Sequence, residues 1–169
     1  MGTWSRRLLF TLTLGLATPI VAADPLLAAK QSPAKTDEDP VVGVWILNVA
    51  KSKYTPGPAP KSQTRIYEAH SDGVKATIKT IYADGHSANV EYVAKYDGVE
   101  YPLTGSAEFD AIAMKRTGAR SAEVRLEHAG TEIGSARRVV SPDGKTMTIT
   151  YENIRDHIHY VAVYDRQQN

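Results

Sequence analysis

The sequence QTRIYEAHSDGVKATIKTIYADGHSANVEYVAKYDGVEY, residues 63–101, decides the fold. Its segments are rich in Val, Ile, Thr and Tyr, and three Asp-Gly pairs separate them at intervals of 12 and 13 residues. Asp-Gly is a strong signal for a tight hairpin turn, and this spacing leaves room for one strand per repeat. The stretch therefore predicts a meander of antiparallel hairpins. The three pairs are Asp72-Gly73, Asp84-Gly85 and Asp97-Gly98.

Further short strands are predicted on both sides of the meander. Pro142-Asp143-Gly144 marks another tight turn between two β-rich segments. With about ten short strands and no convincing helix outside the N-terminal segment, the chain is predicted to be all-β. The strands outside the meander are expected at residues 42–49, 111–117, 122–129, 132–141, 145–152 and 158–166.

Apolar and polar side chains alternate along several of these strands, so one face of each is expected to be buried. About ten sequential strands in one ladder leave two exposed edges unless the ladder closes. The sequence therefore favours a single antiparallel up-and-down β-barrel of about eight to ten strands, with a two-sheet β-sandwich as the alternative. The predicted inward row of the meander is Ala76, Ile78, Thr80, Tyr82, Val90, Tyr92 and Ala94.

The N-terminus has the features of a signal peptide. Arg6 and Arg7 precede a short apolar stretch, and small residues up to Ala23 form a cleavage signature. The Arg pair fits an ordinary Sec signal and also partly fits a twin-arginine signal. We expect a periplasmic or secreted bacterial protein with a signal peptide at 1–23, a flexible leader at 24–40 and a β-barrel domain at 41–169.

Composition narrows the classes of partner. Without Arg6 and Arg7 the chain has 18 basic and 19 acidic residues, which argues against nucleic acid or an anionic membrane surface as the partner. The chain contains no cysteine, so disulfides and a lipid-modified cysteine are excluded. No stretch reaches the roughly 20 apolar residues of a spanning helix, so no transmembrane segment is expected in the mature chain.

A Gly-x-Trp motif, Gly43-Val44-Trp45, lies near the start of the first predicted strand. With the β meander that follows, it resembles the lipocalin and calycin superfamily. Residues 96–105 and 137–148 also resemble a group of exported bacterial proteins of unknown function, and the resemblance covers about residues 42–166. It implies a lipocalin-like barrel in which Trp45 plugs one end and Arg166, from the last strand, covers the tryptophan.

The chain has nine tyrosines but only two phenylalanines, and several tyrosines fall on the predicted inward faces. Tyrosine combines an apolar ring with a hydroxyl, which suits a cavity for a ligand of mixed polarity; the alternative is that these rings only pack the core. Arg116 is the candidate for a carboxylate clamp, and at most one of Arg137 and Arg138 points inward. The candidate ligand-binding residues are Ile78, Tyr82, Tyr92, Met114, Arg116, Met147 and Tyr151.

Other kinds of site have weaker support. His157 and His159 are two residues apart, as two metal ligands on one strand face would be, but two histidines do not complete a site. The chain has no G-x-S-x-G, no H-E-x-x-H and no thiol. We therefore expect neither an enzyme nor a cofactor.

Two functions remain open from the sequence. The first is a non-catalytic exported barrel that binds a small, partly hydrophobic ligand in its interior. The second is an envelope interaction module with a filled core, in which the proline-rich loop at residues 55–60 contacts a protein partner. An open or a filled interior distinguishes the two.

Overall fold

A computed structural model describes residues 39–71, 73–153 and 155–168 of the chain. The predicted signal peptide and residues 24–38 of the predicted leader lie outside the described residues. The described part of the chain is built from strands, and one short 3-10 segment, η2 (Val49–Lys51), follows the first of them. No helix among these residues is long and apolar enough to cross a membrane.

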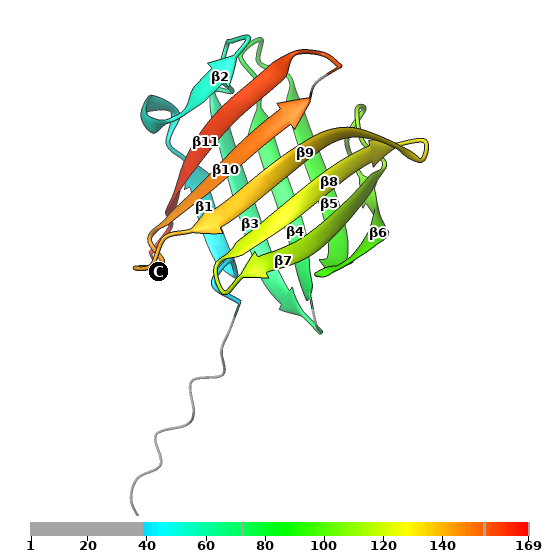
Figure 1. Ribbon diagram of the computed structural model, residues 1–169. Helices are drawn as coiled ribbons and strands as arrows, with labels where there is room; N and C mark the ends of the chain where they lie inside the picture. The colour runs from blue at the N-terminus through cyan, green and yellow to red at the C-terminus, as the bar shows by residue number, and fades with distance from the viewer. Residues whose placement is uncertain (1–38, 72, 154, 169) are drawn as a thin grey trace, which may run out of the picture. The chain divides into compact units, whose positions relative to one another are not determined.

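Eleven strands follow one another along the chain (Figure 1). They are β1 (Gly43–Leu47), β2 (Lys53–Thr55), β3 (Ser62–His70), β4 (Gly73–Ile81), β5 (Ser87–Lys95), β6 (Asp97–Thr104), β7 (Ala111–Gly118), β8 (Ser121–His128), β9 (Thr131–Val140), β10 (Thr146–Asn153) and β11 (Ile158–Arg166).

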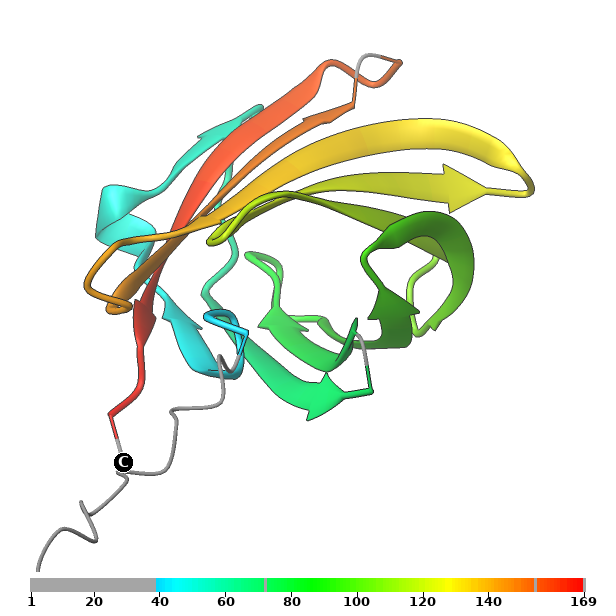
Figure 2. The same ribbon diagram turned by 60° about the horizontal axis from the view of Figure 1, so that its bottom comes forward.

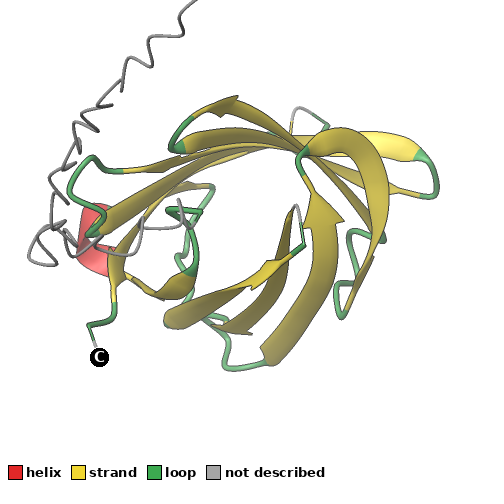
Figure 3. Cartoon of the chain, turned by 90° about the horizontal axis from the view of Figure 1, so that it is seen from below, coloured by secondary structure: helices red, strands yellow, loops and turns green. Residues whose placement is uncertain are grey.

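Ten of these strands form a closed antiparallel ring. Each strand from β3 to β11 pairs with the next one in sequence, and β1 closes the ring by pairing with both β3 and β11. Figure 3 shows this ring from below, and Figure 2 shows its wall from an intermediate angle. The predicted up-and-down barrel is confirmed, and the sandwich alternative is wrong. β2 is an additional short strand that pairs with β11 beyond the end of β1.

Two of the Asp-Gly pairs, Asp84-Gly85 and Asp97-Gly98, form turns because both residues suit a sharp reversal; Asp72 of the third pair lies outside the described residues. Gly85 and Gly98 have positive φ angles of 98° and 79°, a conformation that glycine adopts without steric cost. The Asp84 carboxylate accepts a hydrogen bond from the backbone N–H two residues later, at 3.1 Å, and the Asp97 carboxylate does the same at 3.0 Å. These local bonds fix the hairpins and therefore the register of the meander.

The predicted inward row of the meander is confirmed for six of its seven members. Ala76, Ile78, Thr80, Tyr92 and Ala94 are buried, and Val90 is half-buried. The prediction is wrong for Tyr82, which follows the last residue of β4, is 39% exposed and stacks on the His86 ring with 4.1 Å between ring centres. The alternation fails at Tyr82 because the chain is already turning there.

Candidate functional site

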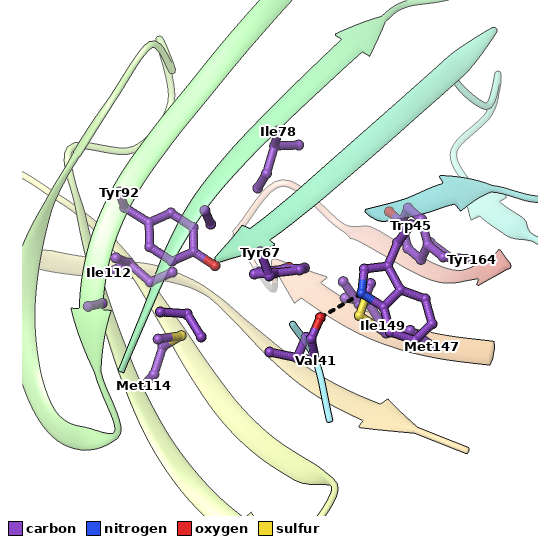
Figure 4. Close-up of a cluster of buried hydrophobic side chains, with 14 of the residues drawn as sticks. Val41, Trp45, Tyr67, Ile78, Tyr92, Ile112, Met114, Met147, Ile149 and Tyr164 are labelled. Carbon is purple, nitrogen blue, oxygen red and sulfur yellow. Dashed lines mark hydrogen bonds between the residues drawn. The ribbon is translucent and has the colours of Figure 1, made fainter. Parts of the chain in front are cut away.

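One end of the barrel is closed by a tryptophan and an arginine; we call it the Trp45 end, defined by Val41, Trp45, Met147 and Arg166. Trp45 is fully buried, and its Nε1 donates a hydrogen bond of 2.7 Å to the carbonyl of Val41 (Figure 4). The Arg166 guanidinium lies over the indole ring, 4.3 Å from its centre. This is the arrangement that the lipocalin resemblance implies, and it brings the first and last strands of the barrel together.

Arg166 also binds the backbone around the tryptophan. It donates to the carbonyls of Gly144 and Val42, both at 2.6 Å, and to the carbonyl of Pro40. Gly43 has a φ of +134°, and a Cβ at that position would lie 2.6 Å from Arg166 Nη1. The glycine of the Gly-x-Trp motif is therefore needed both for its backbone conformation and for the space that the guanidinium takes.

The first of two inward-facing arginines is Arg65, on β3. Its register partner on β1 is Trp45, so it belongs to the inward row of the ring. Arg65 Nε donates to Gln63 Oε1 at 3.0 Å and to the Tyr164 hydroxyl at 3.1 Å, and Nη1 donates to the Tyr67 hydroxyl at 3.4 Å. Arg65 is only half-buried, so its side chain keeps some contact with solvent.

The second is Arg138, on β9, which is 5% exposed. Its guanidinium donates to the Tyr96 hydroxyl at 2.5 Å and lies over the Tyr67 ring, 5.0 Å from the ring centre. Its neighbour Arg137 points outward and is exposed. Arg65 and Arg138 thus approach Tyr67 from β3 and β9, and we call these two residues the arginine pair.

The arginine pair brings positive charge into the interior, and this charge has no ion-pair partner among the described residues. Among these residues no Asp or Glu carboxylate forms an ion pair with either guanidinium; the groups that contact them are tyrosine hydroxyls and the Gln63 amide. Burial alone raises the pKa of the Tyr67 hydroxyl, but Arg65 and Arg138 lower it by more, and the net pKa is below the usual value. Positive charge in a site of low dielectric favours an anion.

The other tyrosines near the pair keep their protons. Burial raises the pKa of Tyr92, Tyr160 and Tyr164, and that of Tyr96 to about 12. At neutral pH these hydroxyls are hydrogen-bond donors as well as acceptors. The interior therefore presents two guanidiniums and several neutral phenols, a set of donors suited to an oxyanion.

The opposite end of the barrel is lined by aromatic rings; we call it the Tyr160 end, defined by Tyr54, Phe109, Tyr151 and Tyr160. Tyr160 stacks on Tyr54 and on Tyr151, with ring centres 5.0 and 4.8 Å apart, and Phe109 meets Tyr151 edge-on at 6.3 Å. A Cβ at Gly134 would lie 2.5 Å from the Tyr151 hydroxyl, so the absence of a side chain there leaves space for that ring.

Burial differs between the two ends. Inward-facing side chains near the Trp45 end, such as Val74, Met114 and Met147, are completely buried. At the Tyr160 end several inward-facing side chains are only partly buried, and they come from six different strands. These are Tyr54, Gln63, Val90, Tyr101, Leu126 and Tyr160. Side chains at the Tyr160 end are therefore partly accessible to solvent.

Five of the seven predicted ligand-binding residues line the interior: Ile78, Tyr92, Met114, Met147 and Tyr151 are buried there. Tyr82 is exposed, as described above. Arg116 is on the inward-facing row of β7, but its guanidinium lies at the Trp45 end. There Nη2 donates to Asp39 Oδ2 at 2.7 Å, and Cζ lies 4.0 Å from the centre of the Tyr96 ring. It already has a carboxylate partner, unlike the arginine pair.

The two candidate metal ligands do not share a strand face. His157 lies in the turn before β11 with a φ of +54°, whereas His159 is in the strand opposite Thr55. Within residues 39–71, 73–153 and 155–168, no group of three or more His, Cys, Asp or Glu side chains could hold a metal ion.

Arg65 and Tyr67 are missing from the sequence-based list of candidates. Arg65 is a charged residue next to the apolar Ile66 in β3, and its pairing with Trp45 places it on the inward face. Arg138 and Arg137 are adjacent, so they point to opposite faces of β9. Arg138 lies on the same face as Val140, which is buried, and this is the only sign in the strand that Arg138 is the inward one. An inward arginine breaks the pattern that identifies a buried face, so only the register reveals it.

Two hollows accompany the interior. One hollow, of about 10 Å³, lies at the Trp45 end. The residues that line it include Asp39, Arg116, Arg120 and Arg138. The other, of about 280 Å³, is lined mainly by outward-facing side chains where β6 separates from β5. Pro102 has no N–H to donate to a ladder, and the pairing of the two strands is limited to two residue pairs.

Comparisons with known proteins do not assign this chain to a family. No protein-family model matches the chain, and no curated protein matches it. Among solved structures, the chain is similar to the crystal structure of the wild-type fluorescent protein UnaG, with 15% sequence identity and a TM-score of 0.48. That alignment covers 75% of this chain and 97% of the UnaG chain.

Proposed function

We propose that this protein is an exported, non-catalytic carrier or sensor that binds a small amphipathic anion inside its barrel. The observation behind the proposal is the arginine pair, two inward guanidiniums surrounded by phenols, with no carboxylate among the described residues to balance them. Desolvating a cation is costly unless an opposite charge compensates it. A bound anion would supply that charge.

The chemistry of the ligand follows from the position of the pair. A carboxylate or sulfonate would accept hydrogen bonds from Arg65 and Arg138 and from the phenols beside them. Its apolar part would then extend toward the Tyr160 end, where aromatic rings provide contact area and the interior is partly accessible. Stacked rings favour a flat apolar group over a branched one.

Export and the absence of catalysis are part of the proposal and depend on the sequence. The features of residues 1–23 support a periplasmic or secreted location. Arginines and tyrosines can bind and orient an anion without forming a nucleophile–base pair, and the sequence contains none of the common hydrolase motifs.

The proposal can be tested with two naphthalene dyes that differ in charge: anionic 1-anilinonaphthalene-8-sulfonate and neutral N-phenyl-1-naphthylamine. Arg138→Met is expected to weaken binding of the anionic dye about tenfold or more, because a hydrogen bond to a charged group contributes about 1.5 to 3 kcal/mol. Binding of the neutral dye should change little. Arg137→Met, an exposed neighbour on the same strand, is the matched control and should leave both affinities unchanged.

Near-ultraviolet circular dichroism on each variant shows whether tertiary packing is retained, since these dyes also bind loosely packed states. The proposal is wrong if the folded wild-type protein binds neither dye saturably. It is also wrong if Arg137→Met and Arg138→Met weaken the anionic dye equally, because the charge inside the barrel would then have no special role.

The interaction module remains a second candidate because of one feature. β2 pairs with β11 alone among the described strands, and Pro56, Gly57 and Pro58 after it are exposed. A short unpaired strand edge beside an exposed proline-rich loop can dock an extended peptide. Replacing residues 56–60 by Gly and Ser should then abolish capture of an envelope partner while the melting temperature stays nearly constant; unchanged capture would contradict this function.

A further inference from the structure

A group of arginines that includes Arg138 of the arginine pair surrounds a carboxylate at the Trp45 end. Arg116, Arg120 and Arg138 line the hollow of about 10 Å³ there, and Asp39 is the only carboxylate among the described residues that line it. The hollow is about the size of one water molecule. Three guanidiniums against one carboxylate leave this position positively charged.

The Asp39 carboxylate is bound in the way that a free oxyanion would be. Its Oδ2 accepts from Arg116 Nη2 at 2.7 Å, and its Oδ1 accepts from the backbone N–H of Val41 at 3.1 Å. The Tyr96 hydroxyl also donates to it. A guanidinium, a phenol and an amide from separate parts of the chain therefore converge on one carboxylate, with the buried Arg138 hydrogen-bonded to Tyr96 behind them.

These donors are held in place independently of Asp39. Val41 is 1% exposed and accepts the Trp45 hydrogen bond, so its amide position is set by the closed barrel end. Tyr96 is held by Arg138, and Arg116 packs on the Tyr96 ring. The Asp39 side chain is 16% exposed, so it lies at the border with solvent, where it can rotate away.

We propose that Arg116, Arg120, Tyr96 and the Val41 amide form a second, oxyanion-binding site in which Asp39 is the resident occupant, and that a phosphate- or carboxylate-sized anion from solution displaces it. The Asp39 carboxylate is an internal competitor, so the affinity of the intact protein for an external anion is lowered by the fraction of time that Asp39 occupies the site. This site adjoins the interior site, which takes an amphipathic ligand at the arginine pair, and the two sites share Arg138 and Tyr96.

The experiment uses inorganic phosphate and the full folded chain. Removing the competitor in Asp39→Ala should tighten phosphate binding at least tenfold relative to wild type, measured by calorimetry and by ³¹P line broadening. Adding Arg116→Gln to Asp39→Ala should return the affinity to the wild-type value or below it. Asp84→Ala, which removes an exposed aspartate from a turn distant from Arg116, is the matched control and should behave as wild type.

A measurement on the wild-type protein keeps the test valid if Asp39→Ala does not fold. Phosphate, but not chloride at equal ionic strength, should shift the Val41 amide signal in a nitrogen–proton correlation spectrum, because that amide loses its Asp39 partner. No shift at saturating phosphate, or equal phosphate affinity in wild type and Asp39→Ala, would overturn the proposal. Arg65→Met should retain the phosphate response, so failure of the interior site and failure of this site are distinguishable.

Discussion

The two ends of the barrel use the same kinds of side chain in opposite ways. At the Trp45 end, Arg166 covers an indole ring and donates to three backbone carbonyls, and the core beneath it is completely buried. In the interior, Arg65 contacts hydroxyls and an amide, and at the Tyr160 end the aromatic rings are stacked but partly accessible. Arginine and aromatic rings meet in both places, but only Arg166 donates to backbone carbonyls, whereas the hydrogen-bond partners of Arg65 are all side chains.

This difference indicates which end is structural and which is available to a ligand. A guanidinium that donates to backbone carbonyls stabilises the closure of the ring, because those carbonyls belong to the segments that must meet. A guanidinium without a carboxylate adds a desolvation cost to folding. Such a residue contributes more to the binding of an anion than to stability.

The largest loss of stability is expected from a substitution at the Trp45 end. Trp45→Ala should lower the free energy of unfolding by about 3 to 5 kcal/mol, because it leaves a cavity in a completely buried layer and removes the ring beneath Arg166. Urea denaturation measures this loss. Tyr54→Ala at the half-buried Tyr160 end is the comparison and should cost clearly less; equal losses would contradict the assignment of a structural and an accessible end.

Replacing Arg166 or Arg65 by methionine should have different effects on stability. Arg166→Met should reduce the free energy of unfolding by about 1.5 to 3 kcal/mol, since carbonyls at the Trp45 end lose a charged donor. Arg65→Met removes a cation that has no carboxylate partner among the described residues and should be neutral or stabilising. Chemical denaturation of both variants checks this; a larger loss in Arg65→Met would show that the pair is structural.

A smaller effect is expected from added volume at the Tyr160 end. Gly134→Ala places a methyl group against the Tyr151 ring and should cost about 1 to 3 kcal/mol, the usual range for overpacking. Because Tyr151 stacks on Tyr160, the shift should also change the affinity for the neutral dye, measured by fluorescence titration. Gly130→Ala, where a Cβ meets no atom within 4 Å, controls for the loss of a glycine in the same hairpin, although its φ of +73° adds some strain.

The smallest expected effect is on how the stability of the folded protein depends on pH. Burial raises the pKa of Asp39, but hydrogen bonds from Tyr96, Arg116 and Val41 lower it by more, so the folded protein holds this carboxyl below its unfolded value of 3.8. A lowered pKa stabilises the folded state above pH 3.8, and this contribution is lost as the pH falls through the folded value. The melting temperatures of wild type and Asp39→Asn should therefore differ at pH 6, and the difference should shrink as the pH falls below 3.8; a constant difference would exclude this linkage.

Much of the fold was predictable from local signals. Asp84-Gly85 and Asp97-Gly98 indicated the hairpins because turn chemistry depends on the residues at the turn and on little else. The last strand, residues 158–166, was predicted with the bounds that the structure gives. Alternation identified Tyr92, Met147 and Tyr151 as inward-facing, since their strands have one apolar and one polar face.

The candidate site was less predictable. Arg65 lies in the interior because β3 pairs with β1 in the register that places Arg65 opposite Trp45. Tyr82 has the right parity but falls where the chain leaves the strand. Arg116 faces the correct side, but its long side chain reaches an aspartate 77 residues away in sequence. Each of these outcomes depends on a partner that is distant in the chain.

The sequence by itself therefore determined the strands, the turns and the order of the hairpins, because these depend on residues a few positions apart. Only the tertiary structure decided that the ladder closes through β1 and β11, which residues from β3 and β9 meet inside, and that Arg166 has backbone partners while the arginine pair has no carboxylate among the described residues. The physical reason is that closure fixes the register around the whole ring, and register decides which charges are buried together.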